Sequence, residues 1–221
     1  MLVLALTAGC AGQQQSVDPA RTLRDAGAAM AKLKTVTATL KFTKGAITFQ
    51  GFTLVGAKTS VRLPADSDTV YTVKQQDISI SIEVVIAGGH VYLHVPFSTY
   101  QELTGAEAAA IPDLAKLFDP ATGLPAVIPA GRNAKFIATE QVGGTDTQKI
   151  GVTYSGDQVK AMVARLNSAV DVNAQVWVGA SDHLIRKALL DGAFGDGGKD
   201  ATVEVDISGF NTPVNIAPPS P

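Results

Sequence analysis

Cysteine is almost absent from this sequence, since Cys10 is the only one among 221 residues. One thiol excludes disulfides within the chain and metal centres that need several thiolates. Charged residues are scarce as well, at 17%, where an average soluble domain has roughly 25%. The formal net charge is −2, so no basic field is present that would attract nucleic acid. Beyond the first residues, no apolar run approaches the roughly 20 residues of a membrane-spanning helix.

Histidine is also rare, with three residues. Two of them, His90 and His94, stand among strand-forming residues, where four residues of strand separate the rings by roughly 13 Å. Zinc ligands lie about 2 Å from the metal, so this pair predicts no zinc site. The consecutive Ser181, Asp182 and His183 cannot form the relay of a hydrolase, and no G-x-S-x-G motif occurs. We therefore expect neither an enzyme nor a cofactor or metal site.

The feature that is present at the start of the chain is the run Leu6-Thr7-Ala8-Gly9-Cys10 behind a short apolar stretch, the pattern of a bacterial lipobox. Cleavage after Gly9 would leave an N-terminal cysteine that carries lipid. We expect residues 1–9 to be a signal-peptide remnant and Cys10 to be the lipidation site, with residues 10–17 forming the anchor and a flexible tether. Thr7 stands where an aliphatic residue is usual, and the missing basic n-region indicates a true start further upstream. A buried free cysteine near a frayed terminus is the competing interpretation of Cys10.

The next segment predicts a helix and then a series of strands. Asp18-Pro19 is an N-cap followed by proline at N1, and an apolar face follows it. From Thr35 the apolar period changes to two, which is typical of half-buried strands. The clearest alternation in the chain places five apolar residues on one strand face: Ile78, Ile80, Ile82, Val84 and Ile86. The alternation does not by itself decide whether this face is the inner or the outer one.

The middle and the second half of the chain complete the pattern. A capping box over Thr104–Glu107 and the pair Asp119-Pro120 each predict a helix start. Between Leu114 and Ile128, prolines interrupt an apolar segment and predict short helices. A capping box over Ser155–Gln158 opens another helix, and the remaining strands are joined mostly by hairpins. About ten strands are expected, which is too many for a flat sheet. The predicted fold is α+β, with one curled antiparallel sheet and helices packed on one of its faces.

Several motifs occur together in a particular order. They are the lipobox, the run Asp119-Pro120-Ala121-Thr122-Gly123-Leu124, the hairpin Gly143-Gly144-Thr145 with Lys149-Ile150, the run Val176-Trp177-Val178-Gly179 with Asp182-His183-Leu184-Ile185, and the proline-rich C-terminus. Over about residues 18 to 218 this set resembles the LppX/LprA/LprF/LprG lipoprotein family of actinobacterial envelopes. The resemblance implies a half-barrel whose helices lie on the concave face around an apolar cavity. It also implies no enzymatic activity. Residues 18–216 would form this lipid-binding domain and residues 217–221 an extended tail.

The apolar stripes supply candidates for the lining of that cavity. The candidates on the predicted sheet and helices are Ile78, Ile80, Ile82, Val84, Phe118, Leu124, Val127, Met162 and Leu166. The proline-broken segment from Leu114 to Ile128 is the candidate gate. Trp177 alternates with Val176 and Val178, which places it either in the core or on the cavity wall, and the core is favoured.

The function that these expectations favour is a lipid-anchored carrier of acylated lipids or glycolipids at the outer face of the cell membrane. Its partners would be an acylated lipid or lipoglycan, the membrane through the lipid anchor, and an inner-membrane transporter, with the chain itself a monomer. The alternative is an envelope sensor or interaction module whose contacts with other proteins are regulated by bound lipid. The two differ in turnover, because a carrier exchanges its ligand and a sensor keeps it.

Overall fold

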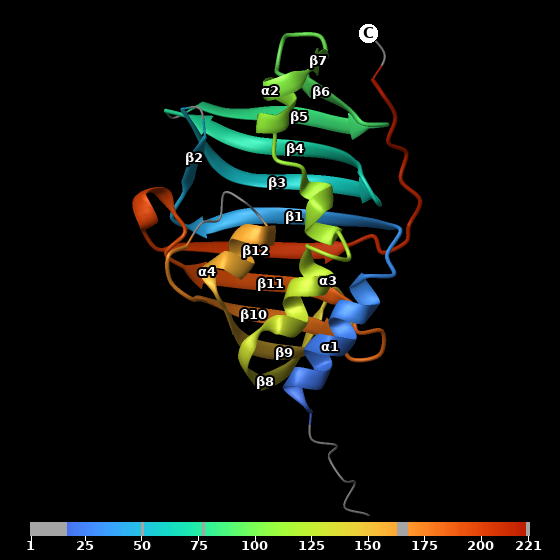
Figure 1. The fold of residues 1–221 in the computed structure, drawn as a ribbon, viewed down its shortest axis with the longest axis vertical. Coiled ribbons are helices and arrows are strands. Elements are labelled where there is room, and N and C mark those ends of the chain that lie inside the picture. The colour runs from blue at the N-terminus through green and yellow to red at the C-terminus, as the bar shows by residue number, and fades with distance from the viewer. Residues whose placement is uncertain (1–16, 50, 77, 163–167, 220–221) are drawn as a thin grey trace, which may run out of the picture.

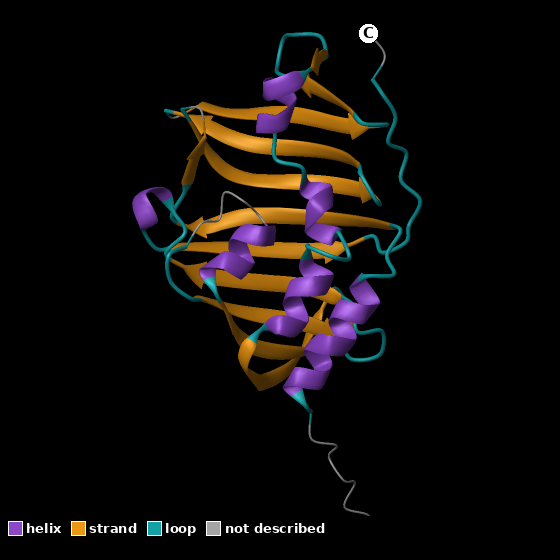
Figure 2. Ribbon diagram, in the orientation of Figure 1, coloured by secondary structure: helices purple, strands orange, loops and turns teal. Residues whose placement is uncertain are grey.

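The computed structural model describes residues 17–49, 51–76, 78–162 and 168–219. One antiparallel sheet dominates it, and the helices lie on one face of that sheet (Figures 1 and 2). The sheet has 12 strands in the order β7-β6-β5-β4-β3-β1-β12-β11-β10-β9-β8, with β2 paired to β3 off this path. It is open, because β7 and β8 form its two edges. No helix in the described ranges is long and apolar enough to cross a membrane.

The elements follow the chain in this order: α1 (Pro19–Met30), β1 (Thr35–Lys44), β2 (Ile47–Phe49), β3 (Phe52–Arg62), β4 (Asp66–Gln75), β5 (Ile78–Ala87), β6 (His90–His94), β7 (Gln101–Leu103), α2 (Gly105–Ala110), η1 (Leu114–Phe118), α3 (Leu124–Val127), η2 (Ile128–Ala130), β8 (Arg132–Val142), β9 (Thr145–Tyr154), α4 (Gly156–Met162), β10 (Val172–Gly179), β11 (Ile185–Gly192), η3 (Asp196–Gly198) and β12 (Ala201–Ser208).

Helix α1 starts where the sequence predicts. The Asp18 side chain accepts a hydrogen bond of 3.1 Å from the backbone N–H of Arg21, and Pro19 occupies the first helical position. Its buried face packs closely on the segment that contains α3 and η2. At Gly27 a Cβ atom would lie 2.5 Å from Cγ of Pro129 and 2.6 Å from the carbonyl oxygen of Pro125. Glycine is therefore required here by close approach of the two helical segments.

Strand β1 lies in the middle of the sheet. It pairs with β3 on one side and with the last strand, β12, on the other. The pairing of Ala38 with Ile207 joins residues far apart in the sequence, and it makes one continuous sheet of the two halves of the chain. The strands of the first half occupy the upper part of Figure 1, and those of the second half occupy the lower part.

One large core fills the space between the sheet and the helices. Leu23 and Met30 of α1, Phe118 of η1 and Val127 of α3 belong to this core, together with strand residues such as Val176. The sheet face that carries these residues is called the helix-bearing face below, and the opposite one the outer face. A smaller apolar cluster on the outer face joins Val85 and Ala87 to Ile216 of the C-terminal segment.

Two local predictions differ from the structure. Thr104 precedes α2, but its side chain makes no capping hydrogen bond, so the predicted capping box is not formed. The predicted cap at Asp119 instead closes a turn, because its carboxylate accepts hydrogen bonds from the N–H groups of Ala121 and Thr122 at 2.9 and 2.8 Å. These bonds and that from the Thr122 hydroxyl lower the pKa of Asp119. The box at Ser155 is formed in both directions, since Ser155 N–H donates to Gln158 Oε1 at 2.8 Å and Gln158 N–H to Ser155 Oγ at 3.3 Å.

Candidate functional site

The isoleucine row of β5 lies on the helix-bearing face. Ile82 stands directly opposite Tyr71 of β4, and the Tyr71 hydroxyl donates a hydrogen bond of 2.8 Å to the carbonyl oxygen of Pro112, just before η1. In the same way Val84 stands opposite Thr69, whose hydroxyl lies 2.8 Å from that of Thr59 on β3. Because side chains alternate along a strand, Ile78 and Ile80 share this face. The structure thus assigns the face that the alternation alone left open.

Exposure changes steadily along this row. Val84 is 2% exposed, Ile82 and Ile80 are half-buried, and Ile78 is 65% exposed. The row therefore runs from the buried part of the helix-bearing face to the molecular surface at the β4–β5 turn. Other apolar side chains that pack partly buried against the core continue the same face into the neighbouring strands: Leu40, Phe42, Leu190 and Val205.

Hydrogen bonds hold the helical segments on this face. Besides the Tyr71–Pro112 bond, the Tyr154 hydroxyl of β9 donates to the carbonyl oxygen of Ile128 at 3.1 Å. The Thr22 hydroxyl of α1 donates to Gln148 Oε1 at 2.9 Å. Burial raises the pKa of both tyrosines, which keeps each phenol protonated and able to donate. The helices are therefore attached to the sheet by a few specific polar contacts as well as by apolar packing.

The remaining candidates from the sequence fall into two groups. Phe118 is 1% exposed and Val127 8% exposed, both within the core, and Leu124 is half-buried against it. The segment from Leu114 to Ile128 thus packs as part of the core in this conformation. Met162 ends α4, but its side chain lies outside what the structure describes, as do Leu166 and Cys10 altogether.

Trp177 is buried, but on the face of the sheet opposite to the helices. It is 5% exposed, yet it alternates with the core residues Val176 and Val178 and so lies on the outer face. The Lys149 and Lys187 ammonium groups lie 4.7 and 5.6 Å from its ring centroid. Its indole N–H donates to Glu140 at 2.6 Å. The ring is therefore buried, as the favoured assignment predicts, but lysine side chains and not the helices cover it.

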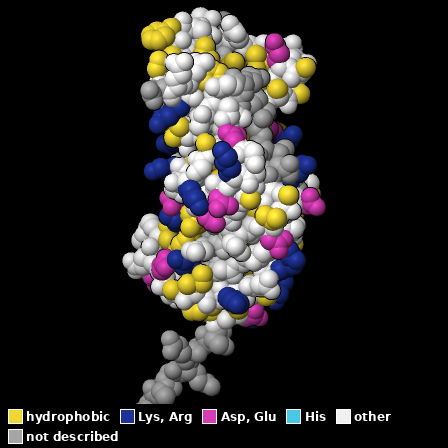
Figure 3. Space-filling model, turned by 90° about the vertical axis from the view of Figure 1, so that its left-hand side faces the viewer, with side chains coloured by type: hydrophobic (Ala, Val, Ile, Leu, Met, Phe, Trp, Pro, Cys, Tyr) yellow, Lys and Arg dark blue, Asp and Glu magenta, His cyan; other side chains and the backbone are white. Residues whose placement is uncertain are grey.

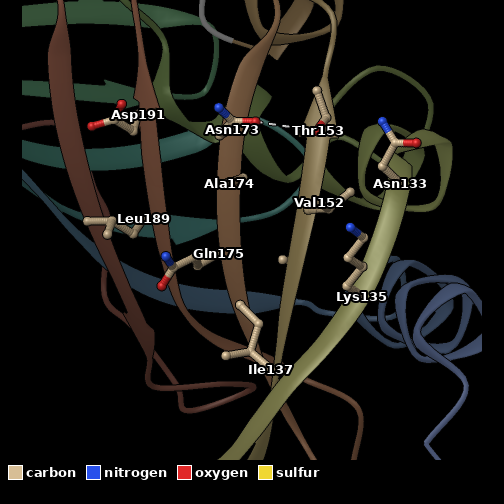
Figure 4. Close-up of a pocket in the computed structure, with 11 residues that line it drawn as sticks. Asn133, Lys135, Ile137, Val152, Thr153, Asn173, Ala174, Gln175, Leu189 and Asp191 are labelled. Carbon is tan, nitrogen blue, oxygen red and sulfur yellow. Dashed lines mark hydrogen bonds between the residues drawn. The ribbon is translucent and has the colours of Figure 1, made fainter.

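An open pocket of about 450 Å³ also lies on the outer face, across β8 to β11 (Figure 4). Gly151 of β9 stands between Lys135 and Gln175 of the adjacent strands and leaves the space. Figure 4 shows Asn173 turning its oxygen toward Thr153, whose hydroxyl donates to it at 3.4 Å. Six of its eleven lining residues carry amide, hydroxyl or charged groups, and apolar side chains such as Ile137, Val152 and Leu189 lie beside them.

The two strand histidines each face a carboxylate. His90 Nδ1 lies 2.6 Å from Glu102 Oε1, and His94 Nδ1 lies 3.7 Å from Glu83 Oε2. Within the described part of the chain, no three His, Cys, Asp or Glu side chains converge as a metal site would require. These pairs are contacts between neighbouring strands.

Sequence reasoning missed one contribution to the site, which is strand β4. Tyr71 and Val73 bring it to the helix-bearing face, whereas Asp66, Asp68 and Thr72 give its sequence a polar character. Val70 and Thr72 lie on one face of β4, and Tyr71 and Val73 lie on the other. The two faces differ too little in polarity for the alternation to be recognised from the sequence. Buried threonines paired by hydrogen bonds, such as Thr69, explain why a polar sequence forms an internal strand.

In sequence, the chain is similar to the lipoarabinomannan carrier protein LprG of Mycolicibacterium smegmatis, with 26% identity over 98% of this chain and 91% of the relative. The LprG of Mycolicibacterium hassiacum is also 26% identical, over 100% of this chain and 94% of its own.

In structure, the fold resembles crystal structures of two mycobacterial lipoproteins. LprF from Mycobacterium bovis superposes with a TM-score of 0.74 at 18% identity, covering 92% of this chain and 97% of LprF. LppX from Mycobacterium tuberculosis gives a TM-score of 0.63 at 20% identity, covering 91% of this chain and all (100%) of LppX. The model of the LppX_LprAFG lipoprotein family matches residues 18–216. The open sheet, its helix-bearing face and this match together show that the chain belongs to the LppX_LprAFG lipoprotein family.

Proposed function

We propose that this protein binds acylated lipids or lipoglycans on the helix-bearing face of its sheet and carries them within the cell envelope. The observation that carries the proposal is the β5 row, which runs from exposed Ile78 to buried Val84. An uninterrupted apolar path from surface to core is what an acyl chain needs to enter between the sheet and the helices. The relatives named as lipoarabinomannan carriers support the same class of ligand.

The energetics suit a carrier. A sixteen-carbon chain gains on the order of 13 kcal/mol on leaving water, at about 0.8 kcal/mol per methylene. A bilayer offers the chain nearly the same gain, so transfer between bilayer and protein is close to neutral. A carrier needs this balance, because it must release what it takes up.

The lipid anchor and the gate belong to the same proposal. Lipidation at Cys10 would hold the body at the outer face of the membrane, where the ligand is collected. The segment from Leu114 to Ile128 covers the helix-bearing face and is joined to β4 and β9 at Pro112 and Ile128. Its movement would open the space between sheet and helices. The other candidate lining residues on that segment are Phe118, Leu124 and Val127.

The test is native mass spectrometry of the chain from Ala11 to Pro221, produced in an actinobacterial host and purified without strong detergent. The expected result is an added mass, close to one ligand per chain, that organic solvent removes and that is identified as an acylated lipid. A chain that arrives without added mass and takes up no acyl lipid afterwards would refute the proposal.

A matched pair of variants locates the ligand. Ile80→Asn places an amide in the β5 row and should reduce lipid occupancy several-fold. Val70→Asn, on the outer face of the neighbouring strand β4, should leave occupancy unchanged, because Val70 is similarly accessible at 37% exposure but points the other way. Equal occupancy in the two variants would remove the β5 row from the proposal.

A further inference from the structure

The turn from Val95 to Ser98, between β6 and β7, exposes a large aromatic side chain. Phe97 is 108% exposed, and the preceding Val95 is 38% exposed. From Val95 to Gln101 the sequence has no Asp, Glu, Lys or Arg. A free phenylalanine in an uncharged turn is a large apolar area with no partner in the described part of the molecule.

The conformation of this turn holds Phe97 outward. Phe97 has φ of 66°, in the left-handed region that bulky residues rarely adopt. The Ser98 hydroxyl donates to the Val95 carbonyl oxygen at 2.8 Å, and the Ser98 N–H donates to the same oxygen at 3.2 Å. A backbone fixed by these bonds in an unfavourable φ, with the ring in solvent, is typical of a residue placed for contact rather than for folding.

The turn lies beside the half-buried part of the β5 row, near Ile82. The last pair between β5 and β6 is Glu83 with His94. Strand β6 therefore ends next to Ile82 of β5, and the turn begins directly after it. Beyond this pair, the stretch of β5 from Ile78 to Ile82 has β4 on one side only. The exposed apolar turn therefore lies near the middle of the apolar path from Ile78 to Val84, in the same corner of the sheet.

This corner is remote from the start of helix α1. Helix α1 begins at the lower end of the molecule in Figure 1, and β6 and β7 lie at its upper end. Figure 3 shows hydrophobic side chains gathered over the upper end, whereas most Lys, Arg, Asp and Glu side chains lie over the middle and lower parts. The start of α1 thus lies at the end of the body opposite to this turn.

We propose that the Val95–Ser98 turn docks on a lipid bilayer by inserting Phe97, and so brings the β5 row to the membrane surface. A bilayer is the occupant that fits, because the turn offers apolar insertion without charge and adjoins a path for acyl chains. This inference rests on the proposed function, because it names the bilayer as the surface from which the lipid-binding site would take its ligand. Because the chain has a formal net charge of −2, docking depends on insertion and not on attraction to anionic lipid.

The experiment uses the chain from Ala11, which keeps every described element and is free of cysteine. Co-sedimentation with phosphatidylcholine vesicles should show binding that persists when salt is raised. Phe97→Ser should lower the partition coefficient about tenfold or more, from the loss of one buried aromatic side chain. Phe97→Leu should retain most of the binding. The matched control is Phe136→Ser on β8, which removes a phenylalanine 40% exposed.

A position-specific probe completes the test. A cysteine introduced as Thr99→Cys and labelled with an environment-sensitive fluorophore should respond to vesicles, whereas the same label at Ser181→Cys, in the β10–β11 turn, should not. Binding by Phe97→Ser equal to that of the unsubstituted chain, an equal loss in Phe136→Ser, or binding abolished by salt would each overturn the docking proposal.

The two proposals are separable in the same preparations. Lipid found by mass spectrometry in Phe97→Ser at the level of the unsubstituted chain, with vesicle binding lost, supports docking as a distinct step. Vesicle binding through Phe97 in a chain that holds no lipid would support docking and refute lipid carriage. Lipid carriage without any vesicle binding would refute docking alone.

Discussion

The hydroxyl of Tyr71 on β4 donates a hydrogen bond of 2.8 Å to the carbonyl oxygen of Pro112. This bond ties the segment that leads into η1 to the part of the sheet that also carries Ile82. It joins the candidate gate to the candidate path for the ligand, so a change at one of them should be felt at the other.

Tyr71→Phe should loosen this attachment. The Pro112 carbonyl would lose its partner at a part-buried position, which costs about 1 kcal/mol of unfolding free energy. Urea denaturation measures that cost, and hydrogen exchange should become faster over residues 112–118. Tyr154→Phe is the matched control, because it removes the bond to Ile128 and should speed exchange near η2 instead. Unchanged exchange after Pro112 in Tyr71→Phe would show that the bond does not restrain the segment.

Gly27→Ala should destabilise the protein although it improves helix propensity. In an isolated helix, alanine is favoured over glycine by about 1 kcal/mol. Here the added Cβ would lie 2.5 Å from Cγ of Pro129, which forces α1 away from η2 at a cost of about 1–3 kcal/mol. Thermal unfolding should give a lower midpoint, while Ala28→Ser on the exposed side of α1 should change little. A raised midpoint in Gly27→Ala would mean that the helices separate freely.

Trp177 should report the titration of Glu140. The hydrogen bond from the indole N–H, followed by the bond from Lys149, lowers the pKa of Glu140 below that of an ordinary glutamate. A carboxylate with a lowered folded pKa contributes stability above its unfolded pKa and loses it as the pH falls through the folded pKa. The emission of the single tryptophan should therefore change in acid, below the pH range in which a free glutamate titrates. Glu140→Gln keeps an acceptor without a titrating group, so an identical acid change in this variant would exclude Glu140 as its source.

Arg62→Lys should release the C-terminal segment. Arg62 donates through Nε and Nη2 to Asp66 at 3.0 and 2.8 Å, and through Nη2 to the carbonyl oxygen of Ile216 at 2.9 Å. A lysine cannot reproduce this planar set of donors. Hydrogen exchange should rise over residues 213–219 with little change in α1. Thr202→Val, which breaks a contact between β11 and β12, serves as a control for general loosening. Unchanged protection at Ile216 would mean that packing on Val85 and Ala87 alone holds the segment.

The sequence predicted those parts of the fold that depend on neighbouring residues. The cap at Asp18, the box at Ser155 and the alternation from Ile78 to Ile86 are local patterns, and the antiparallel sheet with helices on one face follows from them. The family resemblance is confirmed by the match over residues 18–216.

The parts that could not be predicted depend on distant contacts. The pairing of β1 with β12 is set by the closing of the whole chain, and no local pattern encodes it. The burial of Trp177 was predicted, but not the lysine side chains that cover it on the outer face, because alternation does not show which face the helices occupy. The exposure gradient along β5 was also invisible, since it depends on where β6 ends.

The two edge strands, β7 and β8, never pair with each other. A closed barrel has a radius fixed by its strand number and stagger. An open sheet lacks that constraint. Its curvature can adjust to the volume of the groups packed on its face through small changes in twist. The space between the sheet and the helices can thereby widen without breaking a hydrogen bond of the ladder.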